Sequence, residues 1–263
     1  MNYEEICQEV CRIAKTTGGF IKQEREKAQL NIETKGLNDF VTHVDKASEE
    51  LIVEQLQALL PDAGFIVEEG TKTQKGDTYN WIVDPIDGTT NFIHGLAPFA
   101  ISIALQEKGE TVVGVVYEMG LNECFYSWKG GNAYLNKSRI KVSNAKTVSD
   151  SLIATGFPYS NYSRMEAFLK SLTYFMENSH GIRRLGSAAT DLAYVACGRL
   201  DSFYEYDLKP WDVAAGAFLV QQAGGQVCDF TKENNYLFGK EIVASNNATF
   251  EEFSTIVNQI MTK

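Results

Sequence analysis

The sequence lacks any long hydrophobic run. No stretch approaches the roughly 20 consecutive apolar residues that a helix needs to cross a bilayer. Residues 1–5 (MNYEE) are acidic and lack the basic-then-apolar pattern of a secretion signal. We therefore expect a protein without a membrane segment, located in the cytoplasm.

Paired cysteines and clustered histidines are also missing. The cysteines are odd in number and show no zinc-type spacing: Cys7, Cys11, Cys124, Cys197 and Cys228. The histidines are scattered, and none has a metal-binding or nucleophile–base arrangement: His43, His94 and His180. These absences argue against a disulfide framework, a zinc centre and a serine-hydrolase site, and they favour small buried thiols in a reducing compartment.

Positive charge is scarce. The 263 residues include 24 Lys and Arg against 34 Asp and Glu, which gives a formal net charge of −10. We do not expect such an acidic chain to bind nucleic acid directly or to be attracted to anionic membranes. A phosphorylated substrate would need local cations. The composition, with 44% hydrophobic and 22% charged residues, is otherwise that of an ordinary globular protein.

The most informative feature present is a run of acids, glycine and threonines directly after a short apolar strand. It reads Trp81-Ile82-Val83-Asp84-Pro85-Ile86-Asp87-Gly88-Thr89-Thr90-Asn91-Phe92. Pro85 favours extended geometry at Asp84, so the strand carries that carboxylate to its end. Asp84, Asp87 and the Ile86 carbonyl can converge as the hard oxygen ligands that Mg²⁺ prefers. If Thr89 begins a helix, the free amides there would favour phosphate.

A surface turn is the alternative interpretation of this run, because Asp-Pro and Asp-Gly are both common turn dipeptides. A solvated turn, however, has no need of an apolar Trp-Ile-Val lead-in, or of two acids followed by two threonines. For the run as a whole we therefore favour a site that binds phosphate through a divalent metal.

The run resembles the first signature of the inositol monophosphatase family of Mg²⁺-dependent phosphatases, D-P-I-D-G-T-x-N-F, at every fixed position. Residues 211–216 (WDVAAG), continuing through 218–220 (FLV) to 223–225 (AGG), are similar to a second signature, with Gln222 where the family often has Glu. Residues 65–69 (FIVEE) are similar to a third, although Val67 replaces the usual small residue. The order of the three matches the family, so the resemblance is specific.

The resemblance implies two or three Mg²⁺ ions as the cofactor. Glu68, Asp84 and the Ile86 carbonyl would bind one ion, and Asp84, Asp87 and Asp212 would bind a second. A third and weaker site would use Glu68. The attacking water would be activated by metal, and no covalent phosphoenzyme is expected.

The resemblance also implies catalytic roles for Glu68 and Thr89, which would orient the water, and for Asp45, which would fix the Thr89 hydroxyl. Each acid has a structural alternative: Asp45 is spaced to cap the helix from Thr42, Asp212 would be the N-cap of a helix that begins at Val213, and Glu68 would be a solvated strand end. The two roles of Asp45 are compatible, because one carboxylate accepts from both an amide and a hydroxyl.

Substrate contacts follow from the same resemblance. The phosphate would rest on the Gly88 and Thr89 amides, beside Asp87. The alcohol would meet Glu205 and the segment Gly186-Ser187-Ala188 at a helix start. A carboxylate that accepts hydrogen bonds from neighbouring hydroxyls suits a polyol. The alternative for Glu205 is a strand residue that faces water.

The sequence leaves more than one role open for each of three basic residues. Lys35 matches a basic position near the active site, where it would serve a water network or a loop contact. Arg183, which we include among the substrate-binding candidates, and Arg184 would either meet phosphate-rich substrates or form a subunit contact.

Hydrophobic periodicity predicts the elements. Helices are expected over residues 3–28 and from Thr42, with capping-box spacing to Asp45, until Pro61. Strands follow between 65 and 135, including 99–105 and 112–117, in a mainly antiparallel sheet. From about residue 146, strands and helices alternate: strands over 152–155, 201–206 and 241–244, and helices over 165–175, after Ser187, over 212–223 and over 253–260.

Two halves are expected from this pattern. Residues 1–145 would form an N-terminal α+β half with most metal ligands. Residues 146–263 would form a C-terminal α/β half with the substrate-recognition residues and the last ligand. The resemblance implies an α+β fold, the layered α-β-α-β-α sandwich of its family, with the active site between the halves.

The sequence thus predicts a Mg²⁺-dependent phosphomonoesterase that hydrolyses inositol monophosphate. The resemblance further implies a homodimer and sensitivity to Li⁺. Relatives with the same metal motif act on fructose 1,6-bisphosphate, on the 2′-phosphate of NADP or on nucleotide 3′-phosphates. The motif recognises the phosphate group of the ester and not its alcohol. A regulatory, transcription-associated member that acts through protein partners is a further alternative.

Overall fold

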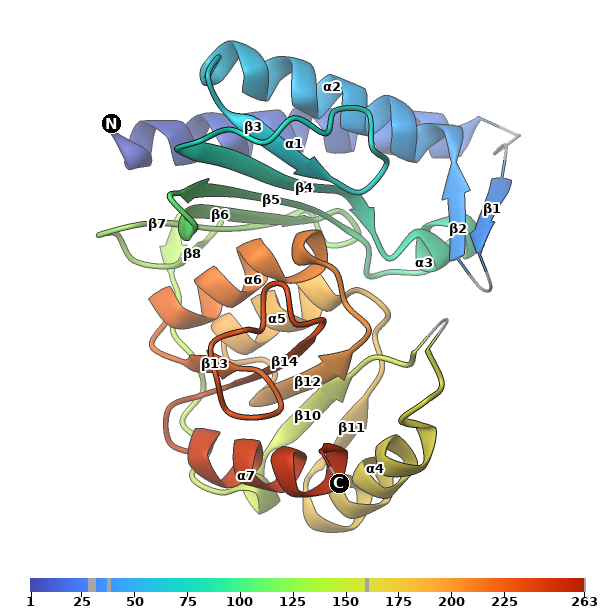
Figure 1. Cartoon of the computed structure of the whole chain (residues 1–263), viewed down its shortest axis with the longest axis vertical. Helices are drawn as coiled ribbons and strands as arrows, with labels where there is room; N and C mark the ends of the chain where they lie inside the picture. The colour runs from blue at the N-terminus through green and yellow to red at the C-terminus, as the bar shows by residue number, and fades with distance from the viewer. Residues whose placement is uncertain (28–31, 37–38, 159–160, 263) are drawn as a thin grey trace.

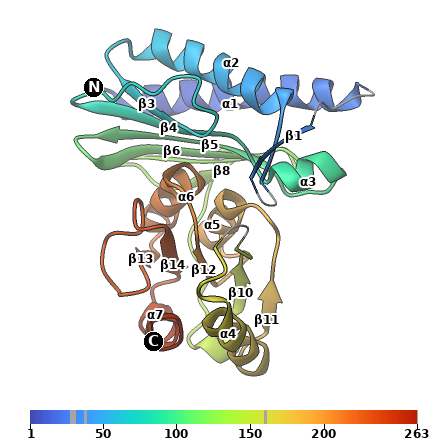
Figure 2. The same ribbon diagram turned by 45° about the vertical axis from the view of Figure 1, so that its right-hand side comes forward.

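The computed structural model describes residues 1–27, 32–36, 39–158 and 161–262, without the side chains of residues 32 and 34–41. The chain forms five layers in the order helices, sheet, helices, sheet, helices (Figures 1 and 2). The N-terminus lies in the first layer and the C-terminus in the last. The predicted α-β-α-β-α sandwich is therefore confirmed.

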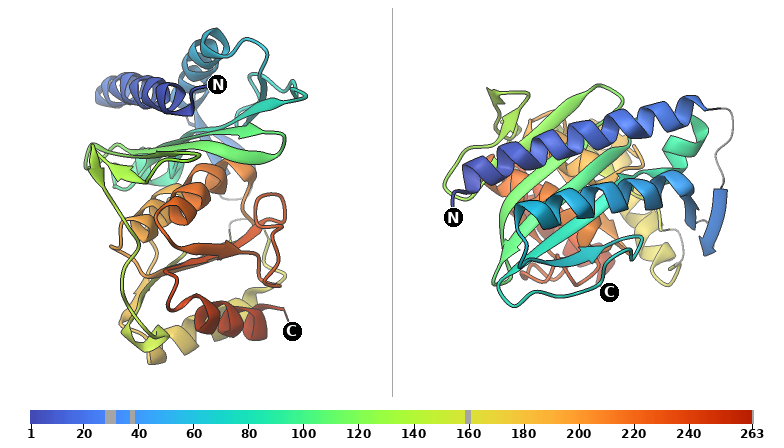
Figure 3. Two further views of the ribbon diagram at one scale, coloured as in Figure 1. Left: turned by 90° about the vertical axis from the view of Figure 1, so that its left-hand side faces the viewer. Right: turned by 90° about the horizontal axis from the view of Figure 1, so that it is seen from above.

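The first layer consists of two long helices, α1 (Tyr3–Glu26) and α2 (His43–Leu59), which lie side by side over one face of a sheet (Figure 3). Helix α2 begins with a reciprocal cap: the Thr42 hydroxyl accepts from the Val44 amide at 3.1 Å, and Asp45 accepts from the Thr42 amide at 2.9 Å. The predicted capping box is thus present, and both predicted helices form.

The second layer is a seven-stranded sheet in the order β3-β4-β5-β6-β7-β8-β9. Strand β3 is parallel to β4, and every other neighbouring pair is antiparallel, as the sequence predicted for this part of the chain. The strands are β3 (Gly64–Val67), β4 (Tyr79–Asp87), β5 (Ala100–Glu107), β6 (Glu110–Glu118), β7 (Glu123–Trp128), β8 (Tyr134–Leu135) and β9 (Ser138–Arg139).

The fourth layer is a five-stranded sheet in the order β11-β10-β12-β14-β13. Strand β10 is parallel to both of its neighbours, and the remaining pairs are antiparallel. The strands are β10 (Leu152–Thr155), β11 (Gly181–Arg183), β12 (Ser202–Tyr206), β13 (Gln226–Cys228) and β14 (Glu241–Ser245). Helices α4 (Met165–Asn178) and α7 (Phe250–Met261) cover its outer face (Figure 1).

The middle layer consists of α5 (Ala188–Ala196) and α6 (Pro210–Gln222), which pack between the two sheets. Because both sides are covered, residues 213–220 of α6 are all buried, and the helix is apolar around its whole circumference. Such packing holds the beginnings of both helices firmly against the seven-stranded sheet. The first turns of α5 and α6 therefore occupy fixed positions at one edge of the middle layer.

Smaller elements complete the fold: the hairpin β1 (Ile32–Gly36) and β2 (Asp39–Thr42), the short helix α3 (Thr89–His94), and a 3-10 turn at Val148–Asp150. The sequence did not predict β1, β2, β11 or β13, because these strands have only three to five residues and show little alternation. Among the helices described, none is long and apolar enough to cross a membrane.

Candidate active site

Asp84 and Asp87 share one side of β4 because this strand contains one extra residue. Asp84 pairs with Ser102 on β5 and Asp87 pairs with Ala100, so three steps along β4 face two steps along β5. Side chains alternate along a regular strand, and an inserted residue brings positions i and i+3 to the same side. Pro85, which has no N–H to donate, lies within this bulge. The apolar strand therefore ends with two convergent carboxylates.

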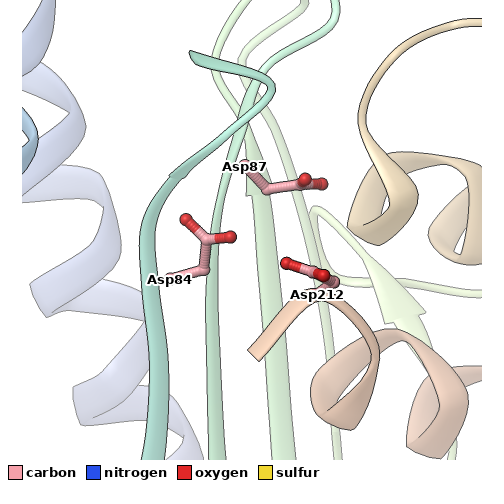
Figure 4. A group of neighbouring side chains, drawn as sticks. All are labelled: Asp84, Asp87 and Asp212. Atoms are coloured by element: carbon pink, nitrogen blue, oxygen red, sulfur yellow. The ribbon is translucent and has the colours of Figure 1, made fainter. Parts of the chain in front are cut away.

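Asp212 completes an acidic cluster with these two residues. One carboxylate oxygen from each of Asp84, Asp87 and Asp212 lies within 4.8 Å of the others. Figure 4 shows the three side chains pointing toward one another, two from the end of β4 and one from the beginning of α6. Asp212 is more than a hundred residues from the other two in the chain, so the layered packing is what brings it to them.

Two hydrogen bonds fix the position of Asp212. Its Oδ2 accepts from the Lys209 amide at 2.7 Å, so it caps the first turn of α6 from the third position of the helix; the structural alternative had placed it as the N-cap of a helix that begins at Val213. Ser102, which faces Asp84 across the β4–β5 pair, donates its hydroxyl to the Trp211 carbonyl at 2.9 Å. The start of α6 is thereby tied to the strand that pairs with Asp84.

The electrostatics of the cluster favour a divalent cation. Burial raises the pKa of Asp84 well above its ordinary value, and the charges of Glu68, Asp87 and Asp212 raise it further. Burial, followed by the charge of Asp87, also raises the pKa of Asp212. Burial raises the pKa of Asp87 to about 6 against the opposing hydrogen bonds of Ser187 and Ala189. Mutually repelling oxygen donors form the ligand set that Mg²⁺ neutralises, so these residues fit the expected metal.

Glu68 lies beside the cluster rather than in it. Val67 pairs with Val83 in the parallel β3–β4 register, and the Glu68 amide donates to the Val83 carbonyl at 3.2 Å. This places Glu68, which is half-buried, next to Asp84, whose pKa its charge raises. The two carboxylates predicted for the first metal site therefore lie on neighbouring segments: Glu68 directly follows β3, and Asp84 lies in β4.

The turn after Glu68 is held by Glu49 of α2, a residue that the sequence analysis did not identify. The fully buried Glu49 carboxylate accepts from the Glu69 amide at 2.6 Å, from the Thr71 amide at 2.9 Å and from the Thr71 hydroxyl at 2.7 Å. Its position on the same face of α2 as the buried Val44 and Ile52 was the available sign of a structural role.

Thr89 and Asp45 meet as the resemblance implied. The Thr89 hydroxyl lies 3.1 Å from Asp45 Oδ1 and 3.0 Å from the Ile86 carbonyl oxygen, and its hydrogen can serve either acceptor. Asp45 also keeps its capping role at Thr42, so one carboxylate contacts both the cap and the Thr89 hydroxyl. Burial raises the pKa of Asp45, whereas the hydrogen bonds from Thr42 and Thr89 lower it. Ile86 is buried between these groups.

Gly88 is required where β4 passes into α3. Its φ of +96° is unfavourable for other residues, and a Cβ there would lie 3.1 Å from the carbonyl oxygens of both Gly186 and Pro98. Thr89 begins α3, as predicted. The absence of a side chain lets the end of β4 approach the segment that leads into α5.

Asp87 joins the acidic cluster to α5. Its Oδ2 accepts from the Ser187 hydroxyl at 2.6 Å and from the Ala189 amide at 2.7 Å. The predicted segment Gly186-Ser187-Ala188 therefore lies directly against one metal-ligand candidate. Asn91 supports the same contact by donating its side-chain amide to the Leu185 carbonyl at 2.8 Å.

Glu205 is buried on β12, with 8% of its surface exposed, and does not face water as its structural alternative required. Its carboxylate lies against Gly156, where a Cβ would be only 1.9 Å from Oε1. Burial raises its pKa well above the ordinary value, and the charges of Asp191 and Asp87 add to this effect. The sequence analysis did not identify Asp191, an acid in the otherwise apolar α5.

The two neighbouring arginines differ. Arg183 is exposed on β11 and donates to the Ile182 carbonyl at 3.0 Å. Arg184 is half-buried, and its charge lowers the pKa of Asp87 and Glu205. Arg184, rather than the predicted Arg183, is thus the arginine that interacts with the site carboxylates. Lys35 falls in β1, and its side chain lies outside the described residues.

Comparison with known proteins gives consistent matches. A profile of the inositol monophosphatase family matches residues 2–262. The Nus factor SuhB of Haemophilus influenzae is 42% identical over 243 residues, which cover 92% of this chain and 91% of that protein. The extragenic suppressor protein suhB from Bartonella henselae superposes with a TM-score of 0.92 at 36% identity, covering 97% of this chain and 99% of the other.

An inositol monophosphatase from Anabaena has a TM-score of 0.85 at 32% identity and covers 99% of this chain and 98% of its own. The relatives thus carry two kinds of name: that of an inositol monophosphatase, and SuhB, called a Nus factor or an extragenic suppressor protein.

Proposed function

The chain belongs to the inositol monophosphatase family, and we propose that it is a Mg²⁺-dependent phosphomonoesterase that hydrolyses inositol monophosphate to inositol and phosphate. The observation that carries this proposal is the cluster of Asp84, Asp87 and Asp212, whose carboxylate oxygens lie within 4.8 Å of one another at the edge of the middle layer.

Two or three Mg²⁺ ions would be held by the cluster, Glu68 and the Ile86 carbonyl. When bound, such ions neutralise phosphoryl oxygens and lower the pKa of water. The protein supplies the surrounding positions. Thr89, held between Asp45 and the Ile86 carbonyl, would orient the attacking water together with Glu68. Preorganised groups of this kind need no rearrangement during the reaction.

The substrate would lie across the junction of the two sheets. Its phosphate would rest on the Gly88 and Thr89 amides at the start of α3, beside Asp87. Its alcohol would face Glu205 and the Gly186-Ser187-Ala188 segment, which Asp87 contacts directly. We further propose a cytoplasmic homodimer that is inhibited by Li⁺, as the family resemblance implies.

The first experiment is phosphate release by the purified protein in Mg²⁺ with inositol 1-phosphate, NADP⁺ or fructose 1,6-bisphosphate. Each assay is repeated with Asp84→Asn and with metal removed by a chelator. We expect inositol 1-phosphate to be the best substrate, and we expect turnover to fall at least about 100-fold in Asp84→Asn. Turnover that survives both changes would contradict the metal mechanism. If NADP⁺ or fructose 1,6-bisphosphate is the best substrate, the proposed substrate alcohol is wrong.

A second candidate function is regulation of transcription through protein partners, which the SuhB names of the relatives favour. The net charge of −10 argues against direct contact with nucleic acid, so this role would depend on a protein surface. Complementation of a deletion strain by Asp84→Asn tests it. Full complementation by this variant would favour regulation, whereas failure with a correctly folded variant would favour catalysis.

A further inference from the structure

Ser102 lies on β5 beside the acidic cluster, directly opposite Asp84 in the antiparallel β4–β5 register. Residues directly opposite each other have their side chains on the same face of a sheet. On β5, Ala100 and Ala104 lie on this face too, and both belong to the core formed with α6. The side chains of Ser102 and Asp84 are almost fully buried, with 1% and 2% of each residue exposed. The Ser102 hydroxyl is therefore enclosed between the sheet and the middle layer, next to a metal-ligand candidate.

This hydroxyl holds the start of α6. It donates to the Trp211 carbonyl at 2.9 Å, and Trp211 directly precedes Asp212 in the chain. Of the hydrogen bonds in the described part of the chain, it is the one that joins the first turn of α6 to the seven-stranded sheet. One hydroxyl thus links the position opposite Asp84 to the residue before Asp212.

The other contacts near this turn constrain Asp212 in different ways. Its carboxylate accepts from the Lys209 amide at 2.7 Å, a bond within the same turn that moves with the helix. One turn further along, a Cβ on Gly114 of β6 would lie 3.0 Å from the Ala215 carbonyl oxygen, so α6 lies directly on the sheet there. Such packing sets how close the helix comes, whereas a hydrogen bond is directional. The bond from Ser102 therefore fixes where the first turn lies along the sheet.

We propose that Ser102 is a positioning residue for the metal: its hydroxyl fixes Asp212 relative to Asp84 and so sets the affinity of the cluster for Mg²⁺. This inference rests on the metal site of the proposed function. Mg²⁺ requires nearly ideal octahedral geometry, with oxygen atoms at about 2.0–2.1 Å. Small displacements of one carboxylate therefore weaken its binding.

Loss of the hydroxyl would leave the first turn of α6 held to the sheet by packing alone. The Asp212 carboxylate would then occupy a wider range of positions opposite Asp84. Substitution of groups that orient metal ligands typically weakens metal binding by about 10- to 100-fold. Ca²⁺ accepts longer bonds, at about 2.3–2.6 Å, in a flexible arrangement, so a looser pair of carboxylates affects it less than Mg²⁺.

The test measures the binding of Mg²⁺ and of Ca²⁺ to the metal-free protein by isothermal titration, without substrate. In Ser102→Ala we expect the Kd for Mg²⁺ to rise at least about tenfold. The Kd for Ca²⁺ should rise less than about threefold, so the ratio of the two constants changes. A merely structural role of Ser102 would weaken both ions equally or neither, and would leave the ratio unchanged.

The matched control is Ser127→Ala. Ser127 of β7 is a fully buried serine of the same sheet, and its hydroxyl donates to the Asn132 carbonyl at 3.1 Å, away from the cluster. Its loss should lower the melting temperature about as much as Ser102→Ala does. Both Kd values should stay within about twofold of those of the wild type.

A second variant, Ser102→Cys, keeps a side chain of similar shape with a weaker donor. Its Kd for Mg²⁺ should lie between those of the wild type and Ser102→Ala, again with a smaller change for Ca²⁺. If Ser102→Ala does not fold, this variant decides, and an unchanged ratio in it would overturn the inference.

Two further results would overturn the inference: an unchanged ratio in folded Ser102→Ala, or an equal change of the ratio in Ser127→Ala. A wild type that binds no Mg²⁺ would overturn it together with the metal mechanism. A wild type that binds Mg²⁺ but releases phosphate from none of the three esters would contradict only the proposed function. The titrations would then still decide the role of Ser102.

Discussion

The carboxylates of Asp84, Asp87 and Asp212 bind protons more readily in the folded chain than they would in the unfolded chain. Burial raises all three pKa values, that of Asp87 from 3.8 to about 6, and the charges of neighbouring acids raise those of Asp84 and Asp212 further. Where the folded state binds more protons, stability falls as the pH rises. The contribution of protonated Asp87 to the free energy of unfolding is therefore lost between about pH 4 and pH 6. The contributions of Asp84 and Asp212 are lost as the pH rises past their raised pKa values.

We predict that Mg²⁺ raises the melting temperature more at pH 7.5 than at pH 5.5, because protons compete with the metal at the lower pH. In metal-free protein, Asp84→Asn should increase stability at pH 7.5 by about 1–2 kcal/mol, since it removes one of the repelling charges. Differential scanning calorimetry at both pH values, with and without Mg²⁺, measures both effects. A larger gain from Mg²⁺ at pH 5.5 would contradict the assignment of these acids to the metal.

Substitution of Thr89 tests whether catalysis can be lost while metal binding remains. Its hydroxyl is held by Asp45 and the Ile86 carbonyl, and it is not part of the carboxylate cluster. We predict that Thr89→Val lowers kcat about 100-fold or more, as expected for loss of a group that positions the attacking water. The stabilisation by Mg²⁺ should remain. Thr89→Ser keeps the hydroxyl and should retain most of the activity.

These two substitutions are compared by steady-state kinetics and by thermal shift in Mg²⁺. If Thr89→Val lost the Mg²⁺ stabilisation as completely as Asp84→Asn, Thr89 would be needed for metal binding rather than for orientation of the water.

At the scale of single elements, α2 supports the end of β3 through Glu49. Three donors from Glu69 and Thr71 converge on its buried carboxylate. We predict that Glu49→Gln lowers the free energy of unfolding by about 2–4 kcal/mol, because the new NH₂ group faces donors where the carboxylate accepted. Mg²⁺ affinity should also fall, since the turn after Glu68 loses its support.

The matched control for this prediction is Glu50→Gln, the next residue on α2, whose side chain is exposed. It should change stability by less than about 0.5 kcal/mol. Urea unfolding and isothermal titration with Mg²⁺ provide the two measurements. Equal behaviour of the two variants would show that Glu49 does not position the turn.

Elements with a strong pattern were predictable from the sequence. Helices α1 and α2, strand β10 and the capping box at Thr42 follow from periodicity and local hydrogen bonding alone. Asp84 and Asp87 were identifiable because they belong to one short motif. The contribution of Glu49 was not predictable, because its partners Glu69 and Thr71 lie outside α2 and only tertiary packing brings them to its carboxylate.

The orientation of the two arginines illustrates the same limit. Arg183 and Arg184 are adjacent in sequence, and neither pattern nor composition distinguishes them. Alternation along the short strand β11 leaves Arg183 exposed, whereas Arg184, just past its end, packs against Phe157. A strand of three residues carries too little pattern to predict which side chain turns inward.

At the scale of the whole molecule, helix α3 links the segment before β5 to the segment before α5, close to the site. Asn91 donates its side-chain amide to the carbonyls of Pro98 and Leu185, both at 2.8 Å. We predict that Asn91→Asp lowers stability by about 2–4 kcal/mol, because an oxygen would then face two carbonyls. This corresponds to roughly 5–15 °C in melting temperature for a chain of this size.

Asn161→Asp serves as the control, since Asn161 uses only its side-chain oxygen, which accepts from Ser163, and Asp retains that acceptor. Calorimetry of both variants should show a large decrease for the first and almost none for the second. Similar melting temperatures would indicate that the contact at Leu185 does not help to hold the segment before α5 against α3.

The division of the acidic cluster between β4 and α6 also bears on biosynthesis. Two of its members are translated early, at positions 84 and 87, whereas Asp212 follows more than a hundred residues later. A nascent chain therefore holds an incomplete set of ligands until α6 has left the ribosome and packed between the sheets. Products of premature termination before that point therefore have no complete cluster of metal-ligand candidates.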